Sequence, residues 1–340
     1  MNIQQDARFS RLKVWLQDQL NDAEFQIEPA SADASFRRYF RVTQSNQTLI
    51  AMDAPPDKED SHPFVRIAGY LNAIHINAPR VLAENFSEGF FLLSDLGHRH
   101  YLSVLNQDNA AQLYADAMQT LFQIQQGGAT YLSSLPPYDE ALLLREMHLF
   151  RDWYLQTHLG LSLSAAQLAV LADAFAFLAG QALSQPRVFV HRDYHSRNLM
   201  YVAQAGNNPG VLDFQDAVAG PLTYDLVSLL RDCYIAWPRT QVMAWVADYH
   251  RHLHDAGMFR EITLEQFVRW FDLMGVQRQL KASGIFARLN HRDGKPGYLN
   301  DIPRTLGYIL QVAPDYPALH GFLTLLDELA VPARLQQVSA

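Results

Sequence analysis

The sequence predicts an α+β protein with two lobes, a small N-terminal lobe rich in strands and a large, mainly helical C-terminal lobe. Three observations lead to this prediction. The chain has 340 residues, which is longer than a single hydrophobic core usually serves. Short runs of β-branched and aromatic residues dominate residues 1–96, and long helical patterns dominate residues 97–340. We therefore place the boundary between the lobes after residue 96.

The N-terminal lobe is expected to begin with a helix, because residues 1–20 are amphipathic. About five strands with one inserted helix follow. The strands are predicted at residues 25–30, 37–44, 48–54, 79–85 and 89–96, and the helix at 62–74. A linker between the lobes is expected at the segment "SDLG".

The C-terminal lobe shows long helical patterns at residues 108–126, 139–158, 164–184, 241–256, 263–288 and 316–330. Short strands return only around residues 187–215, so we expect a small sheet embedded in this lobe. Ligands usually bind in clefts between lobes, and a two-lobed architecture therefore favours a ligand-binding protein.

The composition predicts a soluble cytoplasmic protein. A net charge of −8 gives no attraction to nucleic acid or to anionic membranes, so neither is an expected partner. The single cysteine cannot form an internal disulfide, and the N-terminus lacks the apolar core of a signal peptide. No stretch approaches the ~20 apolar residues of a membrane span. Nothing in the sequence implies an oligomer.

The motif "HRDYHSRN", residues 191–198, lies between two of the short predicted strands. A polar loop separates Asp193 from Asn198, so a carboxylate and a carboxamide are expected at the same end of two strands. The strand in "GVLDFQDA" ends at Asp213, whose carboxylate is expected near the same loop. One acid that takes a proton, with an amide and a second acid as oxygen ligands, is the set needed to bind Mg²⁺–nucleotide and deprotonate a hydroxyl.

A different metal chemistry is also compatible with this motif. His191, Asp193 and His195 alternate, so in a strand they face one side, as zinc or iron ligands would. This metallohydrolase interpretation leaves Asn198 and Asp213 without roles, and it is therefore the weaker one.

A second His-Arg-Asp triplet occurs at residues 291–293, in "HRDGKPGYLN". The residue five positions after its aspartate is Tyr298, which cannot supply an amide oxygen, and no strand like "LDF" follows. We predict that this triplet is not catalytic and lies on a solvated or substrate-contacting loop.

"HRDYHSRN" followed by "LDFQD" resembles the catalytic loop and metal-binding segment of the aminoglycoside phosphotransferase-like kinases, which phosphorylate small molecules. The resemblance implies a protein-kinase-like bilobal fold, with a small antiparallel sheet in the nucleotide-binding N-terminal lobe. It implies that Asp193 is the catalytic base and that Asn198 and Asp213 hold Mg²⁺, with ATP as the donor. Asp225, in "GPLTYDLVSLL", matches an aspartate that braces the catalytic loop, and His191 is expected to be buried and structural.

The N-terminal lobe departs from the kinase pattern. The third strand has Met52 where a kinase lysine contacts the phosphates, and the helix "HPFVRIAGYLNAI" has no glutamate to pair with a lysine. Because both halves of the ion pair are absent together, we expect a different phosphate-binding arrangement. Small residues such as Ser35 permit close backbone approach, and Arg37 and Arg41 are candidates to hold phosphate oxygens. The alternative is that these arginines lie on a solvated edge strand.

The segments "DASFRRYFR", "MDAPP" and "FLLSDLG" resemble one subgroup, the bacterial anomeric kinases for N-acetylmuramic acid and N-acetylglucosamine. This resemblance implies ATP-dependent phosphorylation of the C1 hydroxyl, giving the sugar 1-phosphate in peptidoglycan recycling. On the same basis, the expected nucleotide-binding residues are Ser35, Arg37, Arg41, Met52, Ser94, Asp95 and Leu96.

The sugar is expected between the catalytic loop and the helices, and the candidate contacts are Tyr194, His195, Asp216 and Arg288. Arg288 is a candidate to meet the lactate carboxylate of N-acetylmuramate, and the alternative is a surface or helix-capping arginine. Two other function classes stay open. One is a kinase of the same fold with an aminoglycoside or choline-like acceptor, and the other is a nucleotide-binding pseudokinase.

Overall fold

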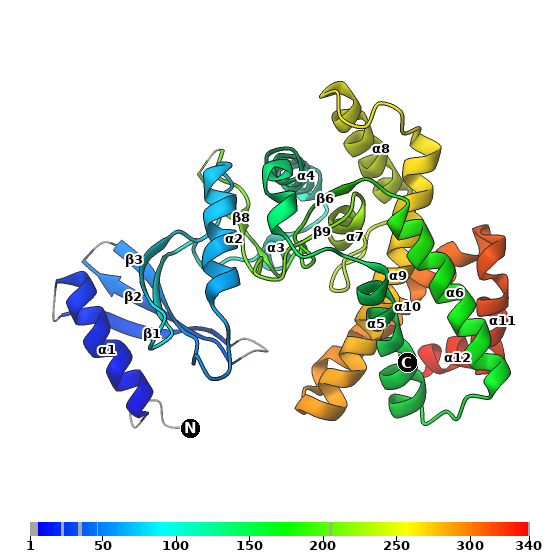
Figure 1. Cartoon of the computed structure of the whole chain (residues 1–340), viewed down its shortest axis with the longest axis horizontal. Coiled ribbons are helices and arrows are strands. Elements are labelled where there is room, and N and C mark those ends of the chain that lie inside the picture. Colours follow the sequence, from blue (N-terminus) through cyan, green and yellow to red (C-terminus); the bar gives the residue numbers. More distant parts are fainter. Residues whose placement is uncertain (1–5, 22–23, 33–35, 46, 205, 339–340) are drawn as a thin grey trace. The chain divides into compact units, whose positions relative to one another are not determined.

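The structure of the protein is a computed structural model, and the residues described are 6–21, 24–32, 36–45, 47–204 and 206–338. The chain divides into two compact units. Unit 1 consists of residues 1–124 and 197–216, and unit 2 of residues 125–196 and 217–340. The predicted combination of a five-stranded antiparallel sheet with a mostly helical remainder is confirmed (Figure 1).

The sheet of unit 1 has the strand order β1-β2-β3-β5-β4, and all neighbouring strands are antiparallel. Its strands are β1 (Gln26–Ala32), β2 (Arg38–Gln44), β3 (Gln47–Asp53), β4 (Val81–Asn85) and β5 (Phe90–Ser94). Strand β2 pairs with β1 on one side and β3 on the other. The arginines of β2 therefore lie on an interior strand, and the edge-strand alternative is wrong.

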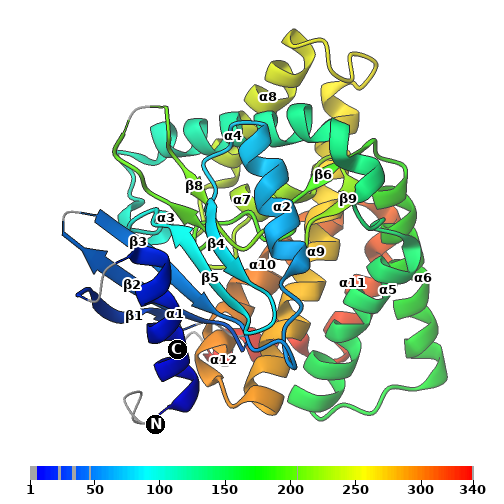
Figure 2. The same cartoon turned by 60° about the vertical axis from the view of Figure 1, so that its left-hand side comes forward.

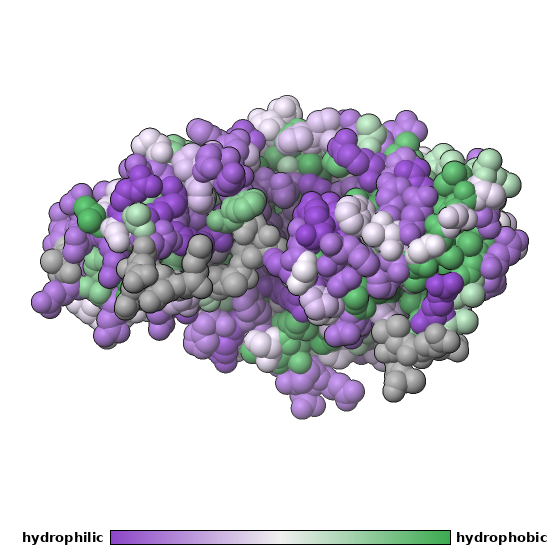
Figure 3. Space-filling model, turned by 90° about the horizontal axis from the view of Figure 1, so that it is seen from below, coloured by the Kyte–Doolittle hydropathy of each residue, from purple (hydrophilic) through white to green (hydrophobic). Residues whose placement is uncertain are grey.

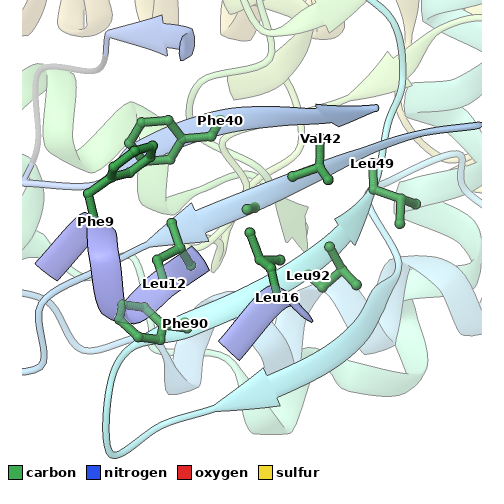
Figure 4. Packing of buried hydrophobic residues seen from close by; sticks show 9 residues of the cluster. Phe9, Leu12, Leu16, Phe40, Val42, Leu49, Phe90 and Leu92 are labelled. Carbon is green, nitrogen blue, oxygen red and sulfur yellow. The ribbon is translucent and has the colours of Figure 1, made fainter. Parts of the chain in front are cut away.

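Two helices cover opposite faces of this sheet, α1 (Ala7–Leu20) and α2 (His62–Ala73) (Figure 1). Successive side chains of a strand point to opposite faces, so β2 presents Phe40 and Val42 to one helix. Figure 4 shows Leu12 and Leu16 of α1 against that face, and all four side chains are buried. Burial of a full Leu or Phe side chain stabilises a fold by about 1.5–3 kcal/mol, so this cluster anchors α1 to the sheet.

The remaining elements of unit 1 are α3 (Tyr101–Val104) and the antiparallel pair β7 (Leu199–Met200) and β8 (Gly210–Val211). The N–H of Val211 donates to the carbonyl of Asn77 at 2.8 Å, just beyond the end of α2. A Cβ atom at Gly210 would lie 2.9 Å from the Leu96 side chain, which explains the glycine there. Helix α4 (Ala110–Gly127) runs from unit 1 into unit 2.

Unit 2 is built around the long helix α9 (Leu264–Asp293), which contacts helices on several sides (Figure 2). A Cβ at Gly284 would fall 2.3 Å from the Leu149 carbonyl carbon, so only glycine allows this close approach. The other elements are η2 (Gly128–Ser134), α5 (Glu140–Leu149), the π-helix η3 (Phe150–His158), α6 (Ala165–Leu183), β6 (Arg187–Val190), β9 (Val218–Pro221), α7 (Tyr224–Leu230), α8 (Arg239–Asp255), η4 (Pro296–Asp301), α10 (Ile302–Val312), η5 (Ala313–Asp315), η6 (Pro317–Leu319), α11 (His320–Glu328) and α12 (Val331–Val338).

The expectation that no stretch approaches the length and apolarity of a membrane span is wrong for helix α6. Among the described residues, it is the one helix long and apolar enough to cross a membrane by length and composition. It begins with a capping box between Ser164 and Gln167, and its residues Leu171, Phe175 and Leu178 are buried within unit 2. One side of α6 therefore packs into the core of unit 2. The surface seen in Figure 3 is mostly hydrophilic, with hydrophobic residues in smaller patches.

The small embedded sheet differs from the prediction. Strand β6 pairs with β9 in unit 2, whereas β7 pairs with β8 in unit 1. The two strands that flank residues 191–198 are thus not members of one sheet. The reason is that each has a later segment of the chain as its antiparallel partner, and β7 and β8 have only two residues each.

Candidate active site

The backbone of the catalytic-loop motif is fixed by Asp225 of α7, which is buried in unit 2. Its carboxylate accepts the N–H groups of His191 at 2.6 Å and of Arg192 at 2.9 Å. Burial raises the pKa of Asp225 to about 7, although these two bonds act in the opposite direction. Arg192 has a φ of 79°, a left-handed conformation that is strained for this residue type. Such strain is most often found at functional sites, because the surroundings must hold it in place.

Asp193 is half-buried in a region of positive charge. Its backbone N–H donates to Nδ1 of the fully buried His191 at 3.2 Å. Burial alone raises the pKa of Asp193, but the charges of the surrounding basic residues hold it below its ordinary value; they are Lys281, His195, Arg278 and Arg192. Asp193 is therefore ionised at neutral pH, in the form that accepts a proton.

Two residues that the sequence analysis missed support this loop. Glu146 of α5 is buried and lies 2.5 Å from the Arg192 guanidinium and 3.1 Å from Nζ of Lys281 on α9. Nζ of Lys281 also donates to the Tyr224 hydroxyl at 2.9 Å. Burial alone lowers the pKa of Lys281, but Glu146 and Tyr224 raise it, so the lysine stays charged. The sequence signal that could have indicated Glu146 is its position among the apolar residues on the buried side of the predicted helix.

The candidate metal ligands lie together in unit 1. Nδ2 of Asn198 donates to Oδ2 of Asp213 at 3.1 Å, and Leu212 N–H donates to the Asn198 carbonyl at 2.9 Å. Asp213 is exposed, and its φ of 64° is again left-handed. A carboxylate beside a carboxamide, whose oxygen is a further possible ligand, suits Mg²⁺, a hard cation. The residues present therefore fit the metal that the resemblance implies.

Asp213 is positioned through its neighbour Phe214, which is fully buried. The ring of Phe214 stacks on Phe64 of α2, with ring centroids 5.1 Å apart. Helix α2 therefore packs against the segment that carries the candidate metal ligand.

The residues expected to contact the nucleotide have different surroundings. Met52 is fully buried on β3, and Oγ of Ser94 accepts the N–H of Arg80 at 2.9 Å. Leu96 packs against Gly210, as described above. Ser35 lies outside the described residues. Their contacts with a nucleotide stay predictions.

The arginines of the "FRRYFR" segment pair with four different carboxylates, those of Asp95, Asp53, Asp6 and Glu59. Arg41 forms a two-pronged pair with Asp95, at 2.7 and 3.2 Å, and also donates to the Gly97 carbonyl at 2.7 Å. Burial alone raises the pKa of Asp95, but Arg41 and the Gly97 N–H lower it below its usual range. The guanidinium group of Arg41 thus binds two residues of the predicted linker "SDLG", Asp95 and Gly97.

Arg38 and Arg37 use other partners. Nε of Arg38 donates to Asp53 at 3.0 Å. Nη2 of Arg37 lies 3.3 Å from Glu59, and both side chains are largely buried.

The four candidate sugar contacts differ in how deeply their side chains are buried. Tyr194 is fully buried and its ring meets His191 edge to face, which places it in the core of unit 2. His195 is also buried, with its ring against Tyr234. Asp216 is exposed at the end of the segment that belongs to unit 1. Arg288 is half-buried on α9.

The second His-Arg-Asp triplet does not form a loop. Residues 291–293 make the last turn of α9, which Gly294 ends with a left-handed φ of 65°. Asp293 is exposed and pairs with Arg292 at 2.8 Å. The prediction of a loop is wrong because glycine, placed after the triplet, acts as the helix cap.

The zinc or iron alternative finds no support in the described part of the chain. No group of three or more His, Cys, Asp or Glu side chains is placed there to hold a metal ion. His191 instead uses Nδ1 to accept the N–H of Asp193.

These features define a phosphotransferase of the kinase-like class. Residues 26–264 match the model of the Phosphotransferase enzyme family, and the chain belongs to that family. The predicted resemblance is thereby confirmed. A curated relative from Pseudomonas putida, named N-acetylmuramate/N-acetylglucosamine kinase, is 45% identical over 97% of this chain and 98% of its own length.

A second relative with the same name, from Pseudomonas aeruginosa, is 46% identical over 95% of this chain and 97% of its own length. Among solved structures, an aminoglycoside phosphotransferase bound to ADP matches with a TM-score of 0.56. That match has 16% identity and covers 88% of this chain and 97% of the other. It bears out the kinase-like fold.

Proposed function

We propose that this protein transfers the γ-phosphoryl group of ATP to the C1 hydroxyl of N-acetylmuramic acid, N-acetylglucosamine or both, in the recycling of cell-wall sugars. The observation that carries the proposal is the similarity, over almost the whole chain, to kinases named for these two sugars. Residues 1–96 are proposed to form the nucleotide-binding lobe and residues 97–340 the lobe with the catalytic loop and the sugar site.

The environment of Asp193 supports an anomeric acceptor. A carboxylate whose pKa is lowered is a weak base, so it works best on an acidic hydroxyl. The C1 hydroxyl of a reducing sugar is more acidic than an ordinary alcohol. The positive charges of Arg278 and Lys281 near Asp193 also disfavour a cationic acceptor such as an aminoglycoside or choline.

In the proposed reaction, Asp193 takes the proton of the C1 hydroxyl while O1 forms a bond to the γ-phosphorus. The bond between the γ-phosphorus and the β–γ bridging oxygen breaks, and ADP leaves with that oxygen. Asn198 and Asp213 would hold Mg²⁺, which would neutralise charge on the phosphate oxygens. The chain's own contribution is mainly to orient the reactants and to keep Asp193 ionised.

The product of the reaction tests the anomeric assignment. With ATP and Mg²⁺, we expect turnover of N-acetylmuramate or N-acetylglucosamine, but not of their methyl glycosides, choline or kanamycin. A methyl glycoside has no proton on O1, and Asp193 can deprotonate only a hydroxyl held within about 3 Å. Coupled ATP consumption and phosphorus NMR of the product are the measurements. Brisk turnover of a methyl glycoside would show that another hydroxyl is the acceptor.

Arg288 is proposed to select for the lactate carboxylate of N-acetylmuramate. It lies seven residues after Lys281 on α9, hence on the same face and roughly 10 Å further along the helix. Its Nε is buried and has no hydrogen-bond acceptor among the described residues. Burial and the charge of Arg292 lower the pKa of Arg288, which indicates an undercompensated cation.

Arg288→Gln is therefore expected to raise KM for N-acetylmuramate by about 10- to 100-fold, the scale of a lost charged hydrogen bond. KM for N-acetylglucosamine, which has no carboxylate, should stay near its original value. The matched control is Arg292→Gln, because Arg292 is exposed and paired with Asp293. Steady-state kinetics on both sugars would refute this role if both KM values rose equally.

A further inference from the structure

Unit 1 lacks the lysine–glutamate ion pair of other kinases but contains a different buried pair, between Arg37 and Glu59. Kinases commonly pair a third-strand lysine with a helix glutamate so that the lysine can reach the phosphates. Here Met52 is fully buried at the lysine position, and α2 contains no glutamate. Arg37 and Glu59 form a pair at 3.3 Å instead, with side chains only 7% and 15% exposed.

Arg37 lies at the place where phosphates are expected. It directly precedes β2, at the end of the β1–β2 connection, and in kinases this connection covers the nucleotide phosphates. The other two arginines of this segment have structural partners at shorter distances, Asp53 for Arg38 and Asp95 for Arg41. The ion pair of Arg37 with Glu59, at 3.3 Å, lies instead directly beside this connection.

Glu59 holds both Arg37 and the chain before it. One carboxylate oxygen accepts the N–H of Phe36 at 3.1 Å, and the other faces the Arg37 guanidinium. The Glu59 side chain thus contacts two successive residues, Phe36 and Arg37, immediately before β2.

Glu59 also lies close in sequence to the helix that packs against the segment of Asp213, the candidate metal ligand. It lies two residues before Ser61, the N-cap of α2. The same helix carries Phe64, which stacks on Phe214 beside Asp213. All of these residues belong to unit 1, so a single compact body contains the complete series of contacts.

We propose that Glu59 is a positioning residue for nucleotide binding: it orients Arg37 toward the phosphates and couples it to α2, in place of the lysine–glutamate pair. The proposal rests on the phosphoryl transfer proposed above, but it concerns only the nucleotide. Removal of one partner leaves the other as an undercompensated buried charge, so both members of the pair should matter.

The test measures nucleotide affinity without a sugar, by calorimetric titration of the full chain with Mg²⁺ and a non-hydrolysable ATP analogue. Glu59→Gln keeps the side-chain shape and removes the charge. We expect its Kd for the analogue to rise by about 10-fold or more, the scale of a lost charged contact. Arg37→Gln should have a similar effect, and the double variant should be little worse than either single one, because the two residues act together.

The matched control is Asp60→Asn. Asp60 is the neighbouring carboxylate, but it is exposed and bonds to His62. Its replacement should leave the affinity unchanged. A folded Glu59→Gln protein that binds the analogue as tightly as the Asp60→Asn protein would overturn the proposal, whatever its melting temperature.

A second variant covers the case in which Glu59→Gln does not fold. Glu59→Asp keeps the charge but withdraws it from Arg37 by one methylene group. We expect the melting temperature to be retained and the Kd for the analogue to rise by about 3-fold or more. Unchanged affinity in this variant would also overturn the proposal. Because no acceptor is present, these outcomes are independent of whether the sugar assignment is correct.

Discussion

Asp193→Asn is expected to lower kcat by at least ~10²-fold, the scale of a general-base contribution. The amide has nearly the same shape as the carboxylate but cannot accept the proton of the acceptor hydroxyl. The loop should keep its conformation, because Asp225, His191 and Glu146 fix its backbone and Arg192 independently of the Asp193 carboxylate. ATP affinity should therefore change little. Steady-state kinetics and calorimetric titration with nucleotide are the measurements.

Asp293→Asn provides the control, since this aspartate occupies the same place in the second triplet. It is exposed at the end of α9 and contacts Arg292, so its loss should have little effect on turnover. Near-normal turnover in Asp193→Asn would remove Asp193 as the base. Equal losses in the two variants would show that the triplets had been assigned wrongly.

Asp213→Ala is expected to abolish the activity supported by Mg²⁺. The substitution removes the carboxylate of the candidate metal site and leaves only the neutral oxygen of Asn198 from this pair. A single neutral oxygen binds a hard divalent cation weakly. The left-handed φ at position 213 persists in both proteins, so a melting curve must accompany the kinetics to separate the loss of metal from strain.

Asn198→Ala should have a smaller effect, because the charged ligand remains. Raised Mg²⁺ or its replacement by Mn²⁺ should partly restore turnover in this variant. The assay is a titration of activity with each metal after treatment with a chelator. Full activity of the unmodified protein after exhaustive chelation would argue for a mechanism without a metal.

The elements that the sequence predicted well are those with strong local patterns. Helix α9 was expected at residues 263–288 and is found at Leu264–Asp293, and α6 was expected at 164–184 and is found at Ala165–Leu183. The helix α10 was missed, because Pro303 and Gly307 weaken its helical pattern although proline is tolerated in a first turn.

The contacts that sequence reasoning missed are those between distant parts of the chain. Glu146 and Lys281 are 135 residues apart in the sequence, and Arg37 and Glu59 are 22 residues apart. Neither pair is marked by the helical or strand periodicity from which contacts along one element can be predicted. Motifs indicated the candidate catalytic and metal residues because the spacing of these residues along the chain is short. The family assignment is confirmed, whereas the roles of the individual site residues and the boundary after residue 96 stay predictions.

The packing of α1 has a practical consequence for work with shortened forms of this protein. The segment shared with the family begins at residue 26, after α1 has ended at Leu20. A chain started at that point would keep the whole match to the family model and yet leave Phe40, Val42 and Leu92 without the helix that covers them (Figure 4). Exposed apolar patches of this kind promote aggregation. The leading helix is thus needed to cover this face of the sheet although it precedes the match to the family model, and it belongs in any shortened form of the protein.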